Sequence, residues 1–61
     1  MRDYRLYFYD RVGHINDVAP LGADDDDVAV EAAATKLHGE QAELWRREWF
    51  VYKFEPDRSV R

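Results

Sequence analysis

The sequence predicts a two-layer α+β domain, in which one helix packs on a four-stranded, mostly antiparallel sheet in the order β-β-α-β-β. Three observations carry this prediction. Residues 24–39 have the acidic start, the alanine-rich body and the closing glycine of a helix. Aromatic-rich stretches at residues 4–10 and 49–54 have the composition of strands. Each of these two stretches is joined to another apolar stretch by a short polar connection, which is typical of a turn.

The first strand covers residues 4–10, which read Tyr-Arg-Leu-Tyr-Phe-Tyr-Asp. Side chains alternate along a strand, so Leu6 and Phe8 share one side with Tyr4. The opposite side carries Arg5, Tyr7 and Tyr9.

A turn at residues 10–13 ends the first strand, and Gly13 is suited to a positive φ there. The second strand runs from His14 to Val18 and continues to Leu21. Because Pro20 has no backbone N–H to donate to a neighbour, this strand belongs at a sheet edge or contains a bulge near Pro20.

The helix begins at the run of four aspartates, Asp24 to Asp27. Asp24 or Asp25 can act as the N-cap by accepting a hydrogen bond from a free amide of the first turn. The remaining aspartates then lie where the positive end of the helix dipole favours negative charge.

The helix is expected to end at Gly39, in the left-handed position that follows a helix, with Lys36 and His38 in its last turn. The spacing i, i+3, i+4, i+7 predicts one narrow stripe of buried side chains. That stripe consists of Val30, Ala33, Ala34 and Leu37.

The third strand covers residues 42–45, and the fourth covers residues 49–54 and ends before Pro56. The connection 46–48 forms a tight hairpin without an Asn-Gly or Asp-Gly signature. Two sheet orders remain open: the second and third strands as parallel neighbours, or the first and fourth paired at the centre, which Pro20 favours. The sheet residues expected to face the helix are Leu6, Phe8, Leu44, Phe50, Tyr52 and Phe54.

The 61 residues allow one domain, over residues 1–56, followed by a frayed tail at residues 57–61. A chain this short buries only about 60% of the surface that its unfolded form exposes, so we expect marginal stability unless oligomerisation adds to it. The absence of cysteine excludes disulfides and thiolate metal sites. Without a signal segment or a run of about 20 apolar residues, we expect a cytoplasmic protein that does not cross a membrane.

Known catalytic and metal-binding arrangements are not recognisable. Ser59 lies in the expected tail and Thr35 on the helix, and neither has a histidine with a third orienting group beside it. His14 lies next to a turn, and the helix dipole accounts for His38. The glycines are scattered, so no phosphate-binding loop is present. We therefore expect no enzyme, no bound metal and no cofactor.

The net charge of −4 is concentrated in residues 24–27, and the rest of the chain is close to neutral. Overall acidity is therefore weak evidence against a nucleic-acid partner. Calcium loops alternate their ligands and place a glycine at the bend, whereas four consecutive aspartates at a helix start fan around its axis. Capping and solvation are sufficient reasons for this acidic patch.

The sheet face away from the helix is expected to be unusually apolar. Its large side chains together would expose more apolar surface than the few hundred Å² that monomers usually expose. A curled sheet or the tail would be needed to cover it; otherwise it is an interaction surface. The apolar residues assigned to this face are Tyr7, Tyr9, Trp45, Trp49 and Val51. The charged residues assigned to it are Arg5, Arg47, Lys53 and Glu43.

Trp49 decides the register of the fourth strand. We expect it to face outward and to pair with Trp45 across the hairpin. A slip by one residue would turn every side chain of the strand to the other side and make Phe50 the exposed one.

The chain resembles a group of short, uncharacterised proteins common in alphaproteobacteria. The resemblance covers roughly residues 4–54 and rests on Tyr4 to Phe8, on Gly13-His14-Ile15, on the acidic start of an alanine-rich helix, and on Glu43-Leu44-Trp45 before a last strand. That family has a glycine-containing turn after the tryptophan, where Arg46 and Arg47 stand here. The resemblance implies this fold and a bacterial origin, and no activity.

Three functions follow as hypotheses. The first is a non-enzymatic interaction module of unknown role that self-associates, as a dimer, through the outer sheet face or an edge strand. The second is binding of single-stranded nucleic acid on the same aromatic face. The third is a small acidic inhibitor of a nucleic-acid enzyme, of the phage anti-defence type, acting through Asp24 to Asp27.

Overall fold

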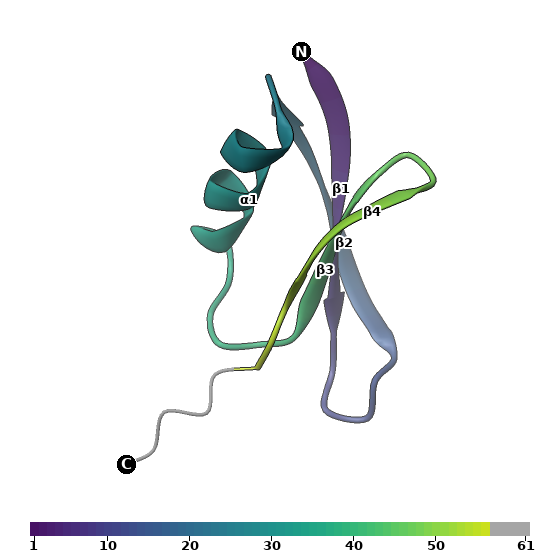
Figure 1. The fold of residues 1–61 in the computed structure, drawn as a ribbon. Helices are drawn as coiled ribbons and strands as arrows, with labels where there is room; N and C mark the ends of the chain where they lie inside the picture. The colour runs from purple at the N-terminus through teal and green to yellow at the C-terminus, as the bar shows by residue number, and fades with distance from the viewer. Residues whose placement is uncertain (57–61) are drawn as a thin grey trace.

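The computed structural model describes residues 1–56, so the expected tail at residues 57–61 lies outside the described residues. It confirms the α+β fold, with one helix beside one open four-stranded sheet (Figure 1). The elements are β1 (Arg2–Tyr9), β2 (Ile15–Ala23), α1 (Asp26–Ala34), β3 (Ala42–Arg46) and β4 (Trp49–Phe54).

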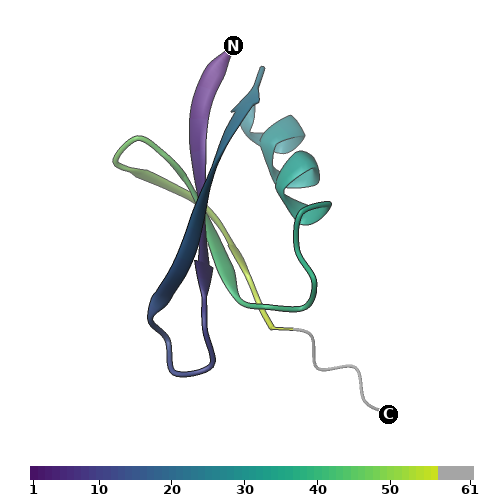
Figure 2. The same ribbon diagram turned by 180° about the vertical axis from the view of Figure 1, so that it is seen from behind.

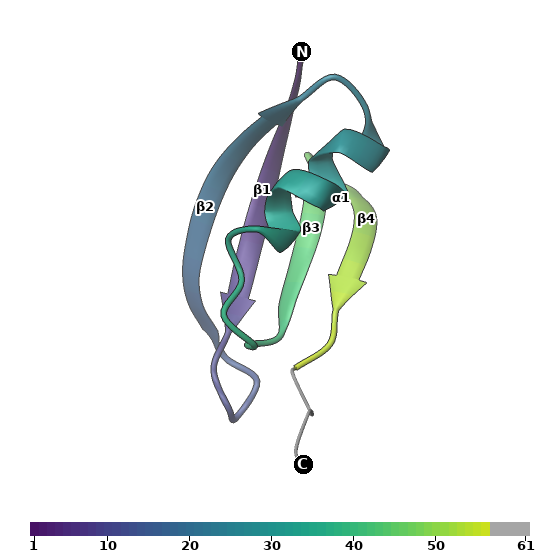
Figure 3. The same cartoon turned by 90° about the vertical axis from the view of Figure 1, so that its left-hand side faces the viewer.

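The sheet has the order β2-β1-β3-β4, and every neighbouring pair is antiparallel (Figure 3). Both predicted orders are wrong, because β1 and β3 pair at the centre. The physical reason lies in burial: the central strands carry fully buried side chains, with Leu6 directly opposite Leu44. The edge position of β2, predicted from Pro20, is confirmed.

The core is small and rich in alanine. Its fully buried members are Tyr4, Leu6, Ala23, Ala29, Ala33, Ala42 and Leu44. Partly buried side chains pack against this cluster from β1, β2, β4 and the helix region; they are Phe8, Leu21, Val30, Leu37, Val51 and Phe54. The small alanines let α1 lie close to the sheet, but they leave little apolar volume inside.

The helix begins as predicted and ends earlier. Asp25 is the N-cap, since its carboxylate accepts a hydrogen bond from the amide of Val28 at 2.9 Å. The helix stops at Ala34, with Thr35 as C-cap, because the next amides bond back only three residues and tighten the chain into a turn. Gly39 has a positive φ of 95°, as expected, but in the loop that follows.

The shorter helix corrects two further predictions. Lys36 and His38 lie beyond the last turn, which contains no basic residue. The buried face is formed by Ala29 and Ala33, whereas Ala34 is exposed. The helix is therefore rotated relative to the predicted stripe, although Val30 and Leu37 still reach the core.

The β1–β2 hairpin is closed by Asp10. Its carboxylate accepts hydrogen bonds from the amides of His14 at 2.9 Å and Val12 at 3.0 Å. These backbone donors, that of His14 first, lower the pKa of the Asp10 carboxyl. Gly13 has the predicted positive φ, at 89°.

The β3–β4 hairpin has a two-residue loop, Arg47 and Glu48, between the paired residues Arg46 and Trp49. Arg47 has a φ of 58°, a left-handed conformation that glycine adopts without strain and that is costly for other residues. Arginine therefore occupies a loop position that two-residue hairpins usually give to a residue tolerant of positive φ.

A bulge in β4 changes which side chains share a face. Leu44 pairs with Tyr52 and Trp45 with Phe50, so Val51 is an extra residue in the ladder. The predicted register is therefore wrong at the start of β4. Phe50 lies on the face of Trp45, whereas Val51 packs against the core.

Candidate interaction surface

The sheet face opposite α1 is bare of any other element within residues 1–56 (Figures 1 and 2). The pairing arranges its side chains in rows across the strands. One row contains Pro20, Arg5, Trp45 and Phe50; the next contains Val18, Tyr7, Glu43 and Lys53; the third begins with Ile15 and Tyr9. We call these ten residues the outer face.

Glu43 organises the centre of the outer face. One oxygen of its carboxylate, Oε1, accepts hydrogen bonds from the Tyr9 hydroxyl at 3.0 Å and from the Trp45 indole N–H at 3.1 Å. Loss of solvation raises the pKa of the Tyr9 phenol, and the bond to Glu43 raises it further. Two aromatic rings are thereby held in fixed positions on the surface.

Trp45 is also fixed from the other side. Its ring meets the ring of Phe50 edge to face, with centroids 5.5 Å apart and planes at 76°. A shallow hollow of about 410 Å³ lies beside it. Its lining consists of Tyr7, Tyr9, Ile15, Glu43, Trp45, Arg47 and Glu48.

Most of the residues predicted for this surface are brought together on it. Arg5, Tyr7, Tyr9, Trp45 and Lys53 lie on the outer face, and Arg47 lines its hollow.

Two predicted members are misplaced. Trp49 does not pair with Trp45 but with Arg46, whose side chain contacts Asp26 of the helix. Trp49 therefore lies toward the helix side, with 60% of its surface exposed. Val51 turns inward because of the bulge.

Sequence reasoning missed three apolar residues of the outer face: Phe50, Ile15 and Val18, which are 53%, 59% and 46% exposed. Strict alternation would place Ile15 and Val18, three residues apart, on opposite faces; the extra residue Asn16 in β2 brings both to the outer face. For this face, Phe50 was named only as the residue that a one-residue slip of the fourth strand would expose, because a bulge leaves no clear mark in a single sequence.

The aspartate run is divided between structural roles and solvent. Asp25 caps the helix, and Asp26 accepts a hydrogen bond from the Tyr4 hydroxyl at 2.6 Å. Burial raises the pKa of the Tyr4 phenol, and the bond to Asp26 adds to that effect. Asp24 and Asp27 are exposed.

A second hollow, of about 290 Å³, lies where β1 begins and β3 ends. It is lined by Met1, Arg2, Asp3, Arg46 and Arg47. Neither Arg2 nor Arg46 was among the predicted site residues. Arg2 and Arg46 come close because β1 pairs with β3. The two strands are antiparallel and Arg5 lies opposite Trp45, so the beginning of β1, with Arg2, lies beside the end of β3, with Arg46.

Comparison of the chain with protein-family models, curated proteins and solved structures finds no match. Over residues 1–56, no helix has the length and apolar character needed to cross a membrane. In the same part of the chain, histidines, aspartates and glutamates form no group of three or more that is suited to a metal ion.

Proposed function

We propose that this protein is an interaction module that self-associates through its outer face. One observation carries the proposal. The chain has two tryptophans, four tyrosines and three phenylalanines, and of these only Tyr4 is fully buried. A domain of this size gains most of its stability from apolar burial, yet here most of the large aromatic surface lies outside the core.

The sheet edges are poorly suited to pairing with a second copy, which favours the face. In β2, Pro20 lacks an N–H, and Asn16 is an extra residue where Phe8 pairs with Asp17 and Tyr9 with Ile15. In β4, the bulge at Val51 and the charged Lys53 interrupt the edge. Proline, bulges and lysine are the features by which proteins discourage edge-to-edge association.

One of the two positive charges of the outer face lies beside a negative one. Lys53 lies directly opposite Glu43, whereas Arg5 lies opposite the uncharged Trp45. Cross-strand pairs of opposite charge stabilise a sheet by a few tenths of a kcal/mol. Compensation also lowers the cost of covering these groups with a second apolar face.

The area of the face sets the expected strength. Four strands about 4.8 Å apart, each contributing about six residues of about 3.4 Å rise, give roughly 400 Å² per copy. A standard interface buries about 800 Å² per partner. With somewhat more than half of this area apolar, as in typical interfaces, about 25 cal/mol per Å² gives a gain of the order of 10 kcal/mol for the two copies together, much of which is cancelled by association costs of about 4–15 kcal/mol. We therefore expect a weak dimer with a dissociation constant in the micromolar range or above.

Phe50→Ala and Trp49→Ala form a matched pair that tests the face. Both remove an exposed aromatic ring from adjacent positions of β4, but only Phe50 lies on the outer face. In sedimentation equilibrium, Phe50→Ala should weaken association at least tenfold, because interface anchors cost about 2 kcal/mol or more when truncated. Trp49→Ala should associate like the wild type.

Circular dichroism of both variants verifies that they remain folded. A wild-type protein that stays monomeric at hundreds of micromolar would refute the proposal. Stronger dissociation by Trp49→Ala than by Phe50→Ala would place the interface on the helix side of β4 instead.

The acidic-inhibitor hypothesis receives less support from the geometry. Asp25 and Asp26 already bond to the helix amide and to Tyr4. A partner would therefore meet Asp24 and Asp27 as free carboxylates rather than a run of four. The alphaproteobacterial resemblance stays a prediction.

A further inference from the structure

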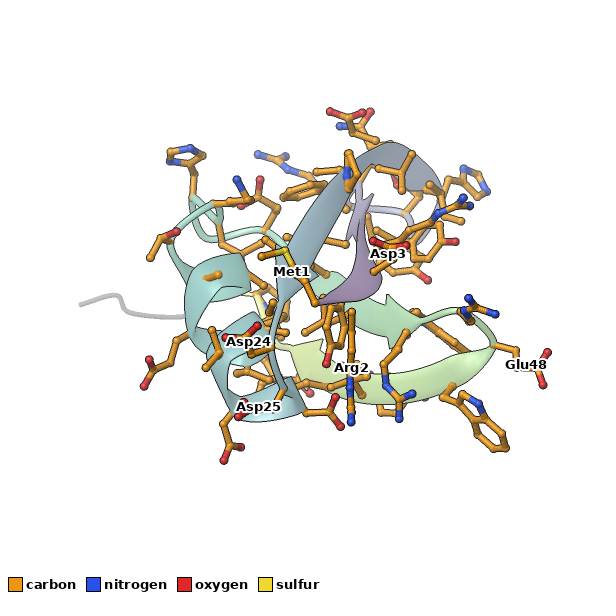
Figure 4. All side chains as sticks on the ribbon, turned by 90° about the horizontal axis from the view of Figure 1, so that it is seen from above. Met1, Arg2, Asp3, Asp24, Asp25 and Glu48 are labelled. Atoms are coloured by element: carbon orange, nitrogen blue, oxygen red, sulfur yellow. The ribbon has the colours of Figure 1, made fainter. Side chains whose placement is uncertain are left out.

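Three arginines line the second hollow together with Met1 and Asp3, at the end of the molecule where the chain begins. The arginines are Arg2, Arg46 and Arg47. Figure 4 shows that Arg2 extends to the side of β1 on which β3 and β4 lie, whereas Asp3 points to the other side. Asp3 nevertheless lines the same hollow and supplies its one carboxylate.

The carboxylate that Arg46 contacts is already engaged. Asp26 Oδ1 accepts the Tyr4 hydroxyl at 2.6 Å, and Arg46 Nε lies 3.5 Å from the same oxygen. This Nε is shielded from solvent and has no hydrogen-bond partner within residues 1–56. Arg2 and Arg47 form no ion pair with any residue of that range. The lining of the hollow thus carries three arginines and one carboxylate, that of Asp3, and the buried Arg46 Nε lacks an acceptor.

Arg47 connects this hollow to the aromatic one. It lines both, and its left-handed backbone holds it at the corner between them. Non-glycine residues held in such conformations occur often at binding sites. On the other side of Arg47, the half-buried Trp45 ring is fixed by Glu43 and Phe50 and lines the aromatic hollow.

We propose that the arginine hollow binds a phosphate group of single-stranded nucleic acid, with a neighbouring base stacked on Trp45. Guanidinium groups bind phosphate through paired hydrogen bonds. Aromatic rings on a sheet accept any base by stacking, so the expected binding has little sequence preference. The net charge of −4 does not prevent this, because at physiological salt charges farther than about 8 Å are largely screened.

Trp49→Phe is the background for the test, since it leaves Trp45 as the only tryptophan. Trp45 fluorescence is then titrated with sodium phosphate, with thymidine monophosphate and with a ten-nucleotide oligo(dT). The ionic strength is constant within each titration, and the titrations are repeated at several salt concentrations. Quenching by the oligonucleotide that weakens as salt increases is the expected result. Phosphate alone should leave the fluorescence unchanged, because it brings no base to the ring.

Arg2→Ala and Arg47→Gly test the arginines, and Arg11→Ala is the matched control. Each removes one positive charge, but Arg11 lies in the β1–β2 turn, outside both hollows. Loss of a phosphate contact should lower the oligonucleotide affinity about tenfold and reduce the salt dependence. Arg47→Gly also relieves the left-handed strain, so weaker binding by this variant cannot be attributed to unfolding.

Three results would overturn the inference: absence of quenching by millimolar oligonucleotide, an equal loss of affinity in Arg11→Ala, or binding that does not depend on salt. Amide resonances of residues 2, 46 and 47 that stay unshifted during the titration would exclude the arginine hollow specifically. Sedimentation of the same samples reports self-association separately, so the failure of either proposal is visible without the other.

Discussion

Arg47 combines an unfavourable backbone conformation with a position between two surface hollows. Its φ of 58° places an arginine where the backbone favours glycine. Within residues 1–56, the Arg47 side chain forms no hydrogen bond or ion pair that would offset this strain. Its guanidinium instead stands between the aromatic and the arginine hollows. A cost to stability at a surface position of this kind is consistent with a role in binding.

Arg47→Gly should therefore make the protein more stable. Relief of left-handed strain contributes roughly 1–2 kcal/mol, and the greater freedom of glycine in the unfolded chain removes about 0.5–1 kcal/mol. We expect a net gain of about 0.5–1 kcal/mol in the free energy of unfolding, measured with urea. Glu48→Gly is the control and should lose stability, since φ is not positive at that residue. A loss in both variants would contradict the assigned loop conformation.

The phenols of Tyr4 and Tyr9 make the folded state sensitive to alkaline pH. Both donate to carboxylates, and loss of solvation together with these bonds raises both pKa values above that of a free tyrosine. A raised folded-state pKa means that the neutral phenol is favoured by folding. The stabilisation is thus complete below about pH 10 and is lost as the pH rises through the folded-state pKa.

Absorbance at 295 nm should accordingly show part of the tyrosine ionisation displaced to higher pH in the folded protein. Tyr4→Phe and Tyr9→Phe should each remove a share of the displaced signal. Tyr4→Phe should also lower the stability at pH 7 by about 1 kcal/mol, the usual net value of one hydrogen bond. Titration of all four tyrosines like the free amino acid would show that these bonds do not form.

At the scale of elements, α1 depends on its cap. A nine-residue helix is too short to be stable alone. It buries only Ala29 and Ala33 completely, so packing contributes modestly. The Asp25 bond to the first turn is therefore a substantial share of what holds it.

Asp25→Ala should destabilise the protein by about 1 kcal/mol, the typical cost of losing an N-cap. Asp24→Ala removes the same charge next to the cap and should change the stability by less than about 0.5 kcal/mol. Thermal unfolding followed by circular dichroism distinguishes the two variants. Equal effects would mean that charge, rather than capping, accounts for the aspartates.

The whole molecule combines a small core with a large exposed aromatic surface. The fully buried side chains include three large residues, Tyr4, Leu6 and Leu44, together with four alanines. Self-association through the outer face would add stability that the core lacks. Such stabilisation depends on concentration by mass action.

The melting temperature should therefore rise with protein concentration in the wild type and in Trp49→Ala, and much less in Phe50→Ala. In a domain of this size, each kcal/mol shifts the melting temperature by about 4–8 °C. Differential scanning calorimetry over a hundredfold concentration range measures this shift. A melting temperature independent of concentration in the wild type would contradict association of the folded state.

The sequence alone determined the features that depend on neighbours along the chain. The order of the elements, an aspartate cap at residue 24 or 25, the positive φ of Gly13, the limits of β4 and the side on which β1 presents Tyr7 and Tyr9 all follow from local composition and alternation. Most of the residues of the candidate surface were predictable for the same reason, since alternation needs only the correct strand.

Only the tertiary structure decided what depends on contacts between distant segments. The pairing of β1 with β3 at the centre, the bulge at Val51 and the meeting of Arg2 with Arg46 and Arg47 are such features. Side-chain burial across the sheet selects the pairing, and one extra residue in a ladder exchanges the faces of its neighbours. Phe50 therefore reached the outer face in place of Trp49, because the partner strand, and not the local sequence, sets the register there.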